Sequence, residues 1–176
     1  DTVFAGACTA PINNDVATTL VILVENSAEY SGLCYMWGDG SAIACCPMSD
    51  DAFPYDFRGI VQHEAGGHGF AKLADEYIYH NAFIDACTCC CCPRLPEFYA
   101  GKALGWYSNL STNGDMRKVE WADLIFHPDY AGIVDMYEGG FYHSRGIYRS
   151  EATSCMNNNI AYYSAIQRME MVQIQF

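Results

Sequence analysis

The segment His63-Glu64-Ala65-Gly66-Gly67-His68 constrains the fold more than any other stretch of the chain. Apolar residues at positions 57, 60 and 61 precede it at helical spacing, and Asp56 is of a type that caps helix N-termini. The sequence therefore predicts a helix that begins after Asp56 and carries this segment.

The two histidines of the segment are five positions apart, one more than in the usual zinc-binding pattern on a helix. Five positions separate His63 and His68 by roughly 140° around an α-helix, which is incompatible with a shared ion. A π-bulge would restore a common face, and such bulges concentrate at functional sites. We expect Gly66 and Gly67 to absorb the distortion, because each glycine costs about 1 kcal/mol relative to alanine in a regular helix.

The residue types of this segment are typical of metal-dependent hydrolysis. The imidazoles of His63 and His68 are candidate Zn²⁺ ligands, and Glu64 is a candidate general base that takes a proton from water activated by the metal. The alternative is that two unrelated histidines lie on a glycine-weakened helix, since a pattern this short also occurs by chance.

Composition and charge exclude several classes of protein. The chain has 176 residues, enough for one domain with a core of its own, and 51% of them are hydrophobic, which indicates a globular protein. Its 21 acidic and 9 basic residues give a net charge of −12, which argues against nucleic acid as a partner. The acidic excess would suit Ca²⁺, although it also simply confers solubility. The longest aliphatic stretch, residues 20–24, is too short to span a bilayer, so no membrane insertion is expected.

Ten cysteines, five of them between positions 87 and 92, indicate an oxidising compartment. The protein is therefore expected to be secreted, or to lie at the cell surface or in the periplasm. Because adjacent cysteines rarely bridge each other, this cluster is expected to form disulfides with the other cysteines, which are Cys8, Cys34, Cys45, Cys46 and Cys155. A second, structural metal site is the alternative, since thiolates bind zinc strongly.

The order of predicted elements favours an α+β domain. A buried strand is expected at residues 18–25, and a hairpin at residues 33–46 around the turn dipeptide Asp39-Gly40. The remaining expectations are a cysteine-stapled loop at 87–96, a short helix at 96–106, a short element at 121–126, a loop at 139–149 and a terminal helix within 162–176.

Three segments resemble the IgA peptidase family of metalloendopeptidases. They are residues 63–77 (HEAGGHGFAKLADEY), 137–151 (YEGGFYHSRGIYRSE) and 154–159 (SCMNNN), within a match that runs from about residue 20 to residue 156. The resemblance implies a zincin-like fold, with an active-site helix across a mixed twisted sheet and a C-terminal helix. One catalytic domain is expected over residues 1–176, with an upper part to about residue 74 and a lower part from about residue 75. The first residues lack a start signal, so the domain is expected to be part of a longer chain.

The third zinc ligand is less clearly marked than the two histidines. In the metzincin pattern it lies six residues after the second histidine, following a glycine at the third position. Ala74 and Ala71 occupy these positions, so the strict pattern fails, and Asp75 is the candidate instead. A helix-terminal carboxylate bonded to nearby backbone is the other interpretation of Asp75. The alternative ligands are Glu76, His80, Glu138 and Glu151.

The later segments supply candidates for the rest of the site. Met156 resembles the Met-turn, an apolar floor beneath the metal, although a lone methionine is more often simply part of the core. Tyr148 is the candidate for stabilising the oxyanion of the tetrahedral intermediate, a role also open to Tyr142, His143 or Arg149. A structural role is the alternative for each of them.

These observations together predict a zinc-dependent endopeptidase that cleaves internal peptide bonds of extracellular protein or peptide substrates. Immunoglobulin A is the substrate of the family's name-giving member, so the resemblance implies immunoglobulin-like substrates. One alternative is a non-catalytic extracellular binding module derived from a peptidase that has lost its activity. Another is a zinc amidase that acts on other amide bonds.

Overall fold

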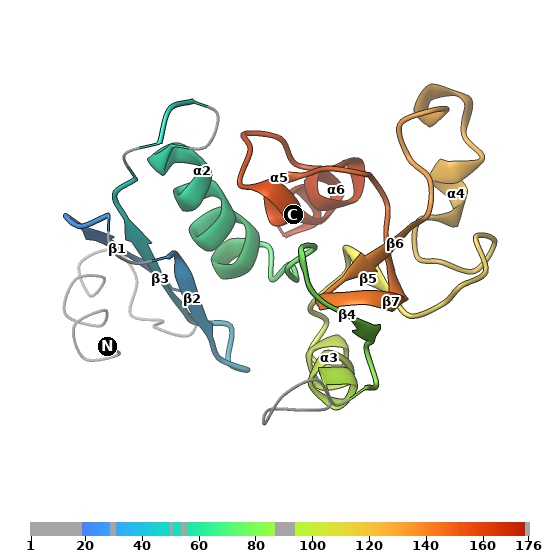
Figure 1. Ribbon diagram of the computed structural model, residues 1–176, viewed down its shortest axis with the longest axis horizontal. Coiled ribbons are helices and arrows are strands. Elements are labelled where there is room, and N and C mark those ends of the chain that lie inside the picture. Colours follow the sequence, from blue (N-terminus) through green and yellow to red (C-terminus); the bar gives the residue numbers. More distant parts are fainter. Residues whose placement is uncertain (1–18, 29–30, 50, 54–55, 87–93, 175–176) are drawn as a thin grey trace. The chain divides into compact units, whose positions relative to one another are not determined.

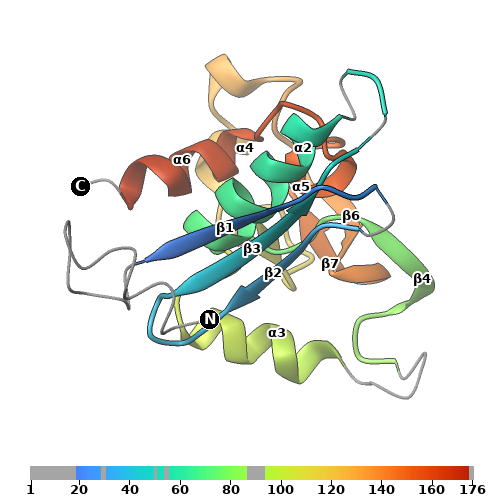
Figure 2. The same ribbon diagram turned by 90° about the vertical axis from the view of Figure 1, so that its left-hand side faces the viewer.

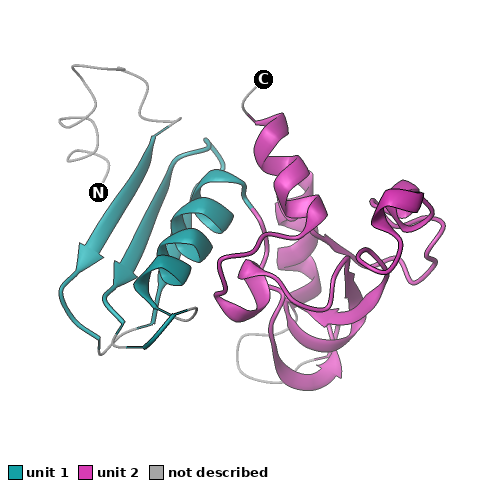
Figure 3. Cartoon of the chain, turned by 90° about the horizontal axis from the view of Figure 1, so that it is seen from above, with its two compact units in different colours: residues 1–72 teal, residues 73–176 magenta. Residues whose placement is uncertain are grey.

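A computed structural model describes residues 19–28, 31–49, 51–53, 56–86 and 94–174. The chain contains helices and mixed sheets, which confirms the expected α+β class (Figure 1). It divides into two compact units, residues 1–72 and residues 73–176 (Figure 3). That the two units form one catalytic domain stays a prediction.

Unit 1 contains a three-stranded sheet that confirms the predicted strand and hairpin. Its strands are β1 (Leu20–Glu25), β2 (Leu33–Met36) and β3 (Ala42–Pro47), in the order β1-β3-β2 (Figure 2). The first strand is not buried as expected, since Ile22, Leu23 and Val24 are exposed among the residues that the structure describes. Strand β3 pairs in parallel with β1 and antiparallel with β2. The turn between β2 and β3 contains Gly40 at a φ of +97°, a conformation that glycine adopts without strain.

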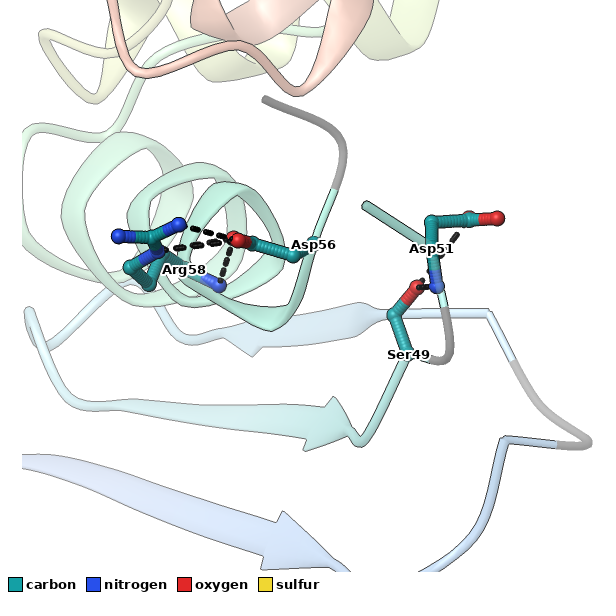
Figure 4. Close-up of polar contacts among 4 residues, drawn as sticks. All are labelled: Ser49, Asp51, Asp56 and Arg58. Carbon is teal, nitrogen blue, oxygen red and sulfur yellow. Dashed lines mark hydrogen bonds and ion pairs between the residues drawn. The ribbon is translucent and has the colours of Figure 1, made fainter. Parts of the chain in front are cut away.

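A continuous helix follows this sheet. It begins as α2 (Phe57–Val61) and continues as η2 (Gln62–Phe70), which is a π-helix. Asp56 is its N-cap, as predicted, because its carboxylate accepts a hydrogen bond of 3.1 Å from the backbone N–H of Arg58. The guanidinium of Arg58 also pairs with the Asp56 carboxylate (Figure 4). The cap therefore satisfies a backbone donor that the first turn would otherwise leave unpaired.

Small side chains on β3 let the helix pack closely on the sheet. Ala44 and Cys46 alternate on the buried face of β3 and form a core with Ala65 of the helix. Further along the helix, Gly69 lies against Leu20, since a Cβ at Gly69 would be only 2.5 Å from Leu20 Cδ1. These contacts fix the segment that carries both histidines against the sheet.

Unit 2 contains a second sheet, which the sequence did not predict. Its strands are β4 (Ile78–Phe83), β5 (Leu110–Ser111), β6 (Tyr137–Gly140) and β7 (Tyr142–Arg149). Strand β7 pairs in parallel with β4 and antiparallel with β5 and β6. The predicted loop at residues 139–149 is therefore wrong, because pairing with three strands and burial of His143 and Ile147 hold this glycine-containing segment as a strand.

The helices of unit 2 agree better than its strands with the elements predicted from the sequence. They are α3 (Arg94–Ala103), α4 (Ala122–Ile125), η3 (Pro128–Tyr130), α5 (Cys155–Asn158) and α6 (Ala165–Gln173). Of these, α3, α4 and α6 confirm the expected short helix, short element and terminal helix. Trp121 and Ile166 belong to the core cluster that joins α6 to the chain around α4. No helix in the described part of the chain is long and apolar enough to cross a membrane.

Candidate metal centre

The hydrogen bonds of the π-helix explain how two histidines five positions apart can lie on the same face of one helix. Ala71 N–H donates a hydrogen bond of 3.0 Å to the backbone oxygen of Gly66. The two residues are five positions apart, which is the hydrogen-bond spacing of a π-helix. Lys72 N–H then donates to His68 O, four residues earlier, at 3.2 Å. The expected distortion is confirmed, but it extends over nine residues instead of being confined to Gly66 and Gly67.

The π-helix brings His63, Glu64 and His68 together. One potential ligand atom from each of the three side chains lies within 4.8 Å of the other two. The ring centres of His63 and His68 are 4.9 Å apart, and the rings are inclined by 76°. Two imidazoles that bind one tetrahedral ion at about 2.0–2.1 Å have ring centres about 5 Å apart. The three side chains could therefore hold a metal ion.

The position of the Glu64 carboxylate depends on a glycine that precedes β2. A Cβ at Gly32 would lie 2.5 Å from Glu64 Oε1 and 2.7 Å from Glu64 Cγ. Real Cβ atoms essentially never come so close to another heavy atom. Gly32 is therefore part of the site, and the sequence alone gives no sign of it, because the contact depends on how the hairpin packs on the helix.

The negative charge of Glu64 contributes to raising the pKa of two nearby thiols, Cys34 and Cys46. Burial, with a further contribution from the Glu64 carboxylate, raises the pKa of Cys34 to about 12 and that of Cys46 to about 11. Both thiols are consequently protonated at neutral pH in the metal-free protein. Neither belongs to the group of potential ligand atoms formed by His63, Glu64 and His68.

The four described cysteines, which are Cys34, Cys45, Cys46 and Cys155, form no disulfide with one another. The other six, Cys8, Cys87 and Cys89 to Cys92, lie outside the described residues. The predicted disulfides and the alternative structural metal site in the cysteine cluster therefore remain predictions.

Lys72 joins the end of the π-helix to the turn between β2 and β3. Its ammonium donates to Gly69 O and to Gly40 O, both at 2.9 Å. Burial lowers the pKa of Lys72, and the nearby Cys34 and Asp39 oppose that shift. The helix ends here, since Lys72 has a φ of +53°.

Asp75, the candidate third ligand, is a buried residue of unit 2. The Tyr142 hydroxyl donates to Asp75 Oδ2 at 2.5 Å, and Phe141 N–H donates to the Asp75 backbone carbonyl at 2.9 Å. Burial, with a further contribution from the Asp75 charge, raises the pKa of Tyr142 far above its usual range, so its hydroxyl remains a donor. The role of Asp75 as a ligand stays a prediction.

Glu76 is fully buried, and its carboxylate accepts hydrogen bonds from three side chains. Oε1 accepts hydrogen bonds from Asn109 Nδ2 at 2.9 Å and Gln167 Nε2 at 2.8 Å, and Oε2 accepts one from Ser154 Oγ at 2.6 Å. Its backbone N–H donates to the carbonyl of Met156, the candidate Met-turn residue, at 2.8 Å. Glu76 therefore joins the chain after Asp75 to α5 and α6, which is a structural role.

Tyr148, the candidate for oxyanion stabilisation, packs against the core cluster around Trp121. A Cβ at Gly114 would lie 3.1 Å from its hydroxyl oxygen, so that hydroxyl lies beside the backbone of Gly114. Burial raises the pKa of Tyr148, with a further contribution from Glu138. The catalytic role of Tyr148 stays a prediction.

The two distant glutamates considered as ligands have hydrogen-bond partners in unit 2. Glu138 Oε1 accepts from Gly146 N–H at 2.9 Å. Glu151 accepts from the Tyr162 hydroxyl and from Ala165 N–H, each at 2.6 Å. Both carboxylates therefore support the structure around them.

No protein-family model matches the chain, and no curated protein matches it.

Proposed function

We propose that this protein is a zinc-dependent endopeptidase that acts on extracellular protein substrates. The observation that carries the proposal is the convergence of His63, Glu64 and His68 on one π-helix, with potential ligand atoms within 4.8 Å of one another. Two imidazoles beside a carboxylate suit zinc chemistry, and Zn²⁺ is the ion that such sites bind in hydrolases. The resemblance of residues 63–77 to the active-site helix of IgA peptidases supports a zincin-like fold and immunoglobulin-like substrates.

In this proposal the imidazoles of His63 and His68 hold the ion. Bound zinc would supply Lewis acidity, which makes water nucleophilic near neutral pH and polarises a carbonyl group. The Glu64 carboxylate accepts the proton of the attacking water and then returns it to the leaving amine. Gly32 supports this role because its missing side chain leaves space for the Glu64 carboxylate.

The experiment that tests the proposal is Glu64→Gln in zinc-loaded protein. Cleavage of a library of extended peptides is expected to fall by about 10²–10⁴-fold, because the variant cannot accept the proton. Zinc content is expected to stay the same, since both imidazoles remain. Glu170→Gln, a similar change on α6, is the control. Undiminished cleavage by zinc-loaded, folded Glu64→Gln protein would contradict the proposal.

A non-catalytic binding module is the second candidate. Exposed aromatic side chains on β2 and directly after it favour it, since Tyr35 is 53% exposed and Trp37 is 45% exposed, with ring centres 6.3 Å apart. Aromatic residues of this kind are enriched at interfaces. Stoichiometric zinc without chelator-sensitive cleavage of any library peptide would favour this candidate. Hydrolysis confined to small amides would indicate a zinc amidase.

A further inference from the structure

His143, on β7, is fully buried, and its hydrogen bond identifies the proton-bearing nitrogen of its ring. Nδ1 lies 2.8 Å from the backbone oxygen of Phe141. A carbonyl oxygen only accepts, so Nδ1 must carry a hydrogen and donate it. In the neutral ring, Nε2 then presents an unprotonated lone pair.

That lone pair has no hydrogen-bond partner among the residues that the structure describes. Leaving a buried polar atom unsatisfied costs about 1–3 kcal/mol, so such an atom calls for a ligand. The hydrogen bond from Nδ1 to a backbone carbonyl is also the arrangement that orients metal-binding histidines and makes Nε2 more basic. Both features suit Nε2 of His143 to binding a cation.

A second imidazole lies beside it on the neighbouring strand. His80 of β4 is the Cα partner of His143, and the ring centres are 5.5 Å apart with an inclination of 48°. This separation is close to the value of about 5 Å for two imidazoles on one tetrahedral ion. His80 is only partly buried, which gives an ion access and leaves coordination positions for water.

We propose that His80 and His143 form a second cation site, which takes a divalent transition-metal ion with a preference for imidazole, such as Zn²⁺. Neither residue belongs to the group formed by His63, Glu64 and His68, and this role replaces those considered above for His80 as a zinc ligand and for His143 in oxyanion stabilisation. Its effect is structural, because the ion links β4 to β7 where their pairing is irregular. The register shifts on both sides of His80, between Ile78 and His80 and again between His80 and Phe83.

Nitrogen NMR of the histidine rings tests this site directly. The chain has five histidines, so a His63→Ala/His68→Ala double variant of the full chain retains only His80, His127 and His143. Without metal, His143 is expected to report hydrogen on Nδ1 and none on Nε2. Added Zn²⁺ should shift Nε2 of His143 and one nitrogen of His80 to metal-bound positions, while the exposed His127 stays unchanged.

The matched control adds His80→Gln to the double variant, since a change at a partly exposed residue is compatible with folding. In this protein the zinc-induced shift of His143 should be lost, whereas His127→Gln should leave it intact. The site is overturned if excess Zn²⁺ leaves the His143 ring unshifted, or if the shift persists after His80→Gln. Because His63 and His68 are absent throughout, the result is independent of the proposed peptidase activity.

Zinc-dependent stability of the same proteins gives a second measurement. Added Zn²⁺ should raise the melting temperature of the double variant, because an ion that binds only the folded state stabilises it. His80→Gln should abolish that rise. A rise that survives His80→Gln would assign the ion to other ligands, such as the cysteine cluster, and would contradict this site.

Discussion

The carboxylate of Glu64 occupies the space that a side chain at position 32 would need. A Cβ at Gly32 would lie 2.5 Å from Glu64 Oε1 and 3.0 Å from Glu64 Cδ. Strand β2 begins immediately after Gly32. The start of β2 and the π-helix therefore jointly determine the position of Glu64, the proposed general base.

Gly32→Ala is therefore expected to displace the Glu64 carboxylate without removing a metal ligand. Catalytic groups misplaced by about 1 Å can cost roughly 10²-fold in rate. Measured kcat should fall by about that factor, while the zinc content stays at the wild-type value. Ser31→Ala, at an exposed neighbouring position, is the control and should leave kcat unchanged. An unaltered kcat in folded Gly32→Ala protein would show that this contact does not position Glu64.

Replacing either His63 or His68 with alanine is expected to abolish stoichiometric zinc at the π-helix. Each variant leaves a single imidazole beside Glu64, which makes a poor site for Zn²⁺. Binding of Zn²⁺ in a chain that also carries His80→Gln, measured by calorimetry, isolates this centre from the second proposed site. His127→Ala is the control. Equal affinity before and after His68→Ala would rule out a site shared by the two imidazoles.

Glu76→Ala is expected to destabilise the fold by about 3 kcal/mol, because three buried donors each lose one hydrogen bond to its carboxylate. Those donors belong to Asn109, Ser154 and Gln167. Glu76→Gln keeps the oxygen that accepts from Asn109 and Gln167, so its cost should be about 1 kcal/mol or less. Chemical denaturation at neutral pH measures both, and equal losses for the two variants would contradict this account.

The charge of Glu76 also gives the stability a dependence on pH. Burial raises the pKa of Glu76 in the folded state, and its hydrogen bonds from Ser154, Asn109 and Gln167 only partly oppose the shift. Because the folded pKa is above the unfolded one, the protonated form favours folding, and this contribution is lost as pH rises through the folded pKa. Denaturation measured upward from pH 4 should show this loss in the wild type, and the loss should be absent from Glu76→Gln.

Alkylation of Cys34 by iodoacetamide is expected to be very slow at pH 8. Its pKa of about 12 leaves on the order of one thiolate in 10⁴ thiols, so the rate should rise about tenfold per pH unit up to that pKa. Glu64→Gln should increase the rate, because the Glu64 charge contributes to the raised pKa. Mass spectrometry of the Cys34 peptide follows the reaction, and the unfolded chain provides the reference rate. A rate at pH 8 equal to that of the unfolded chain would show that the thiol is not protected.

The parts of the site that lie on one continuous helix could be predicted from the sequence. His63, Glu64 and His68 are within six positions of one another, so local helix geometry decides whether they converge. Gly32 could not be found in this way, because its contact with Glu64 arises only when the hairpin packs on the helix. The same holds for His80 and His143, which strand pairing brings together across 63 positions.

The missed sheet of unit 2 has a comparable explanation. The segment that forms β6 and β7 is rich in glycine, which usually interrupts strands. Gly139 and Gly146 have φ angles of +110° and +77°, and Gly139 lies so close to Ile78 that a Cβ would be 2.4 Å from Ile78 Cδ1. The glycines here serve bulged pairing and close packing on β4, which local sequence patterns cannot reveal.

The π-helix has a consequence for how such sites arise and how they are recognised. Relative to a four-residue spacing, Gln62–Phe70 holds one additional residue between two imidazoles whose ring centres are still only 4.9 Å apart. In an α-helix one inserted residue would rotate one ligand away from the other. A π-helix accommodates it, because its hydrogen bonds join residues five apart instead of four. A search that counts positions between histidines would overlook this arrangement. What the additional residue leaves intact is the proximity of the two rings, which depends on the hydrogen-bond pattern of the helix as well as on the number of residues between them.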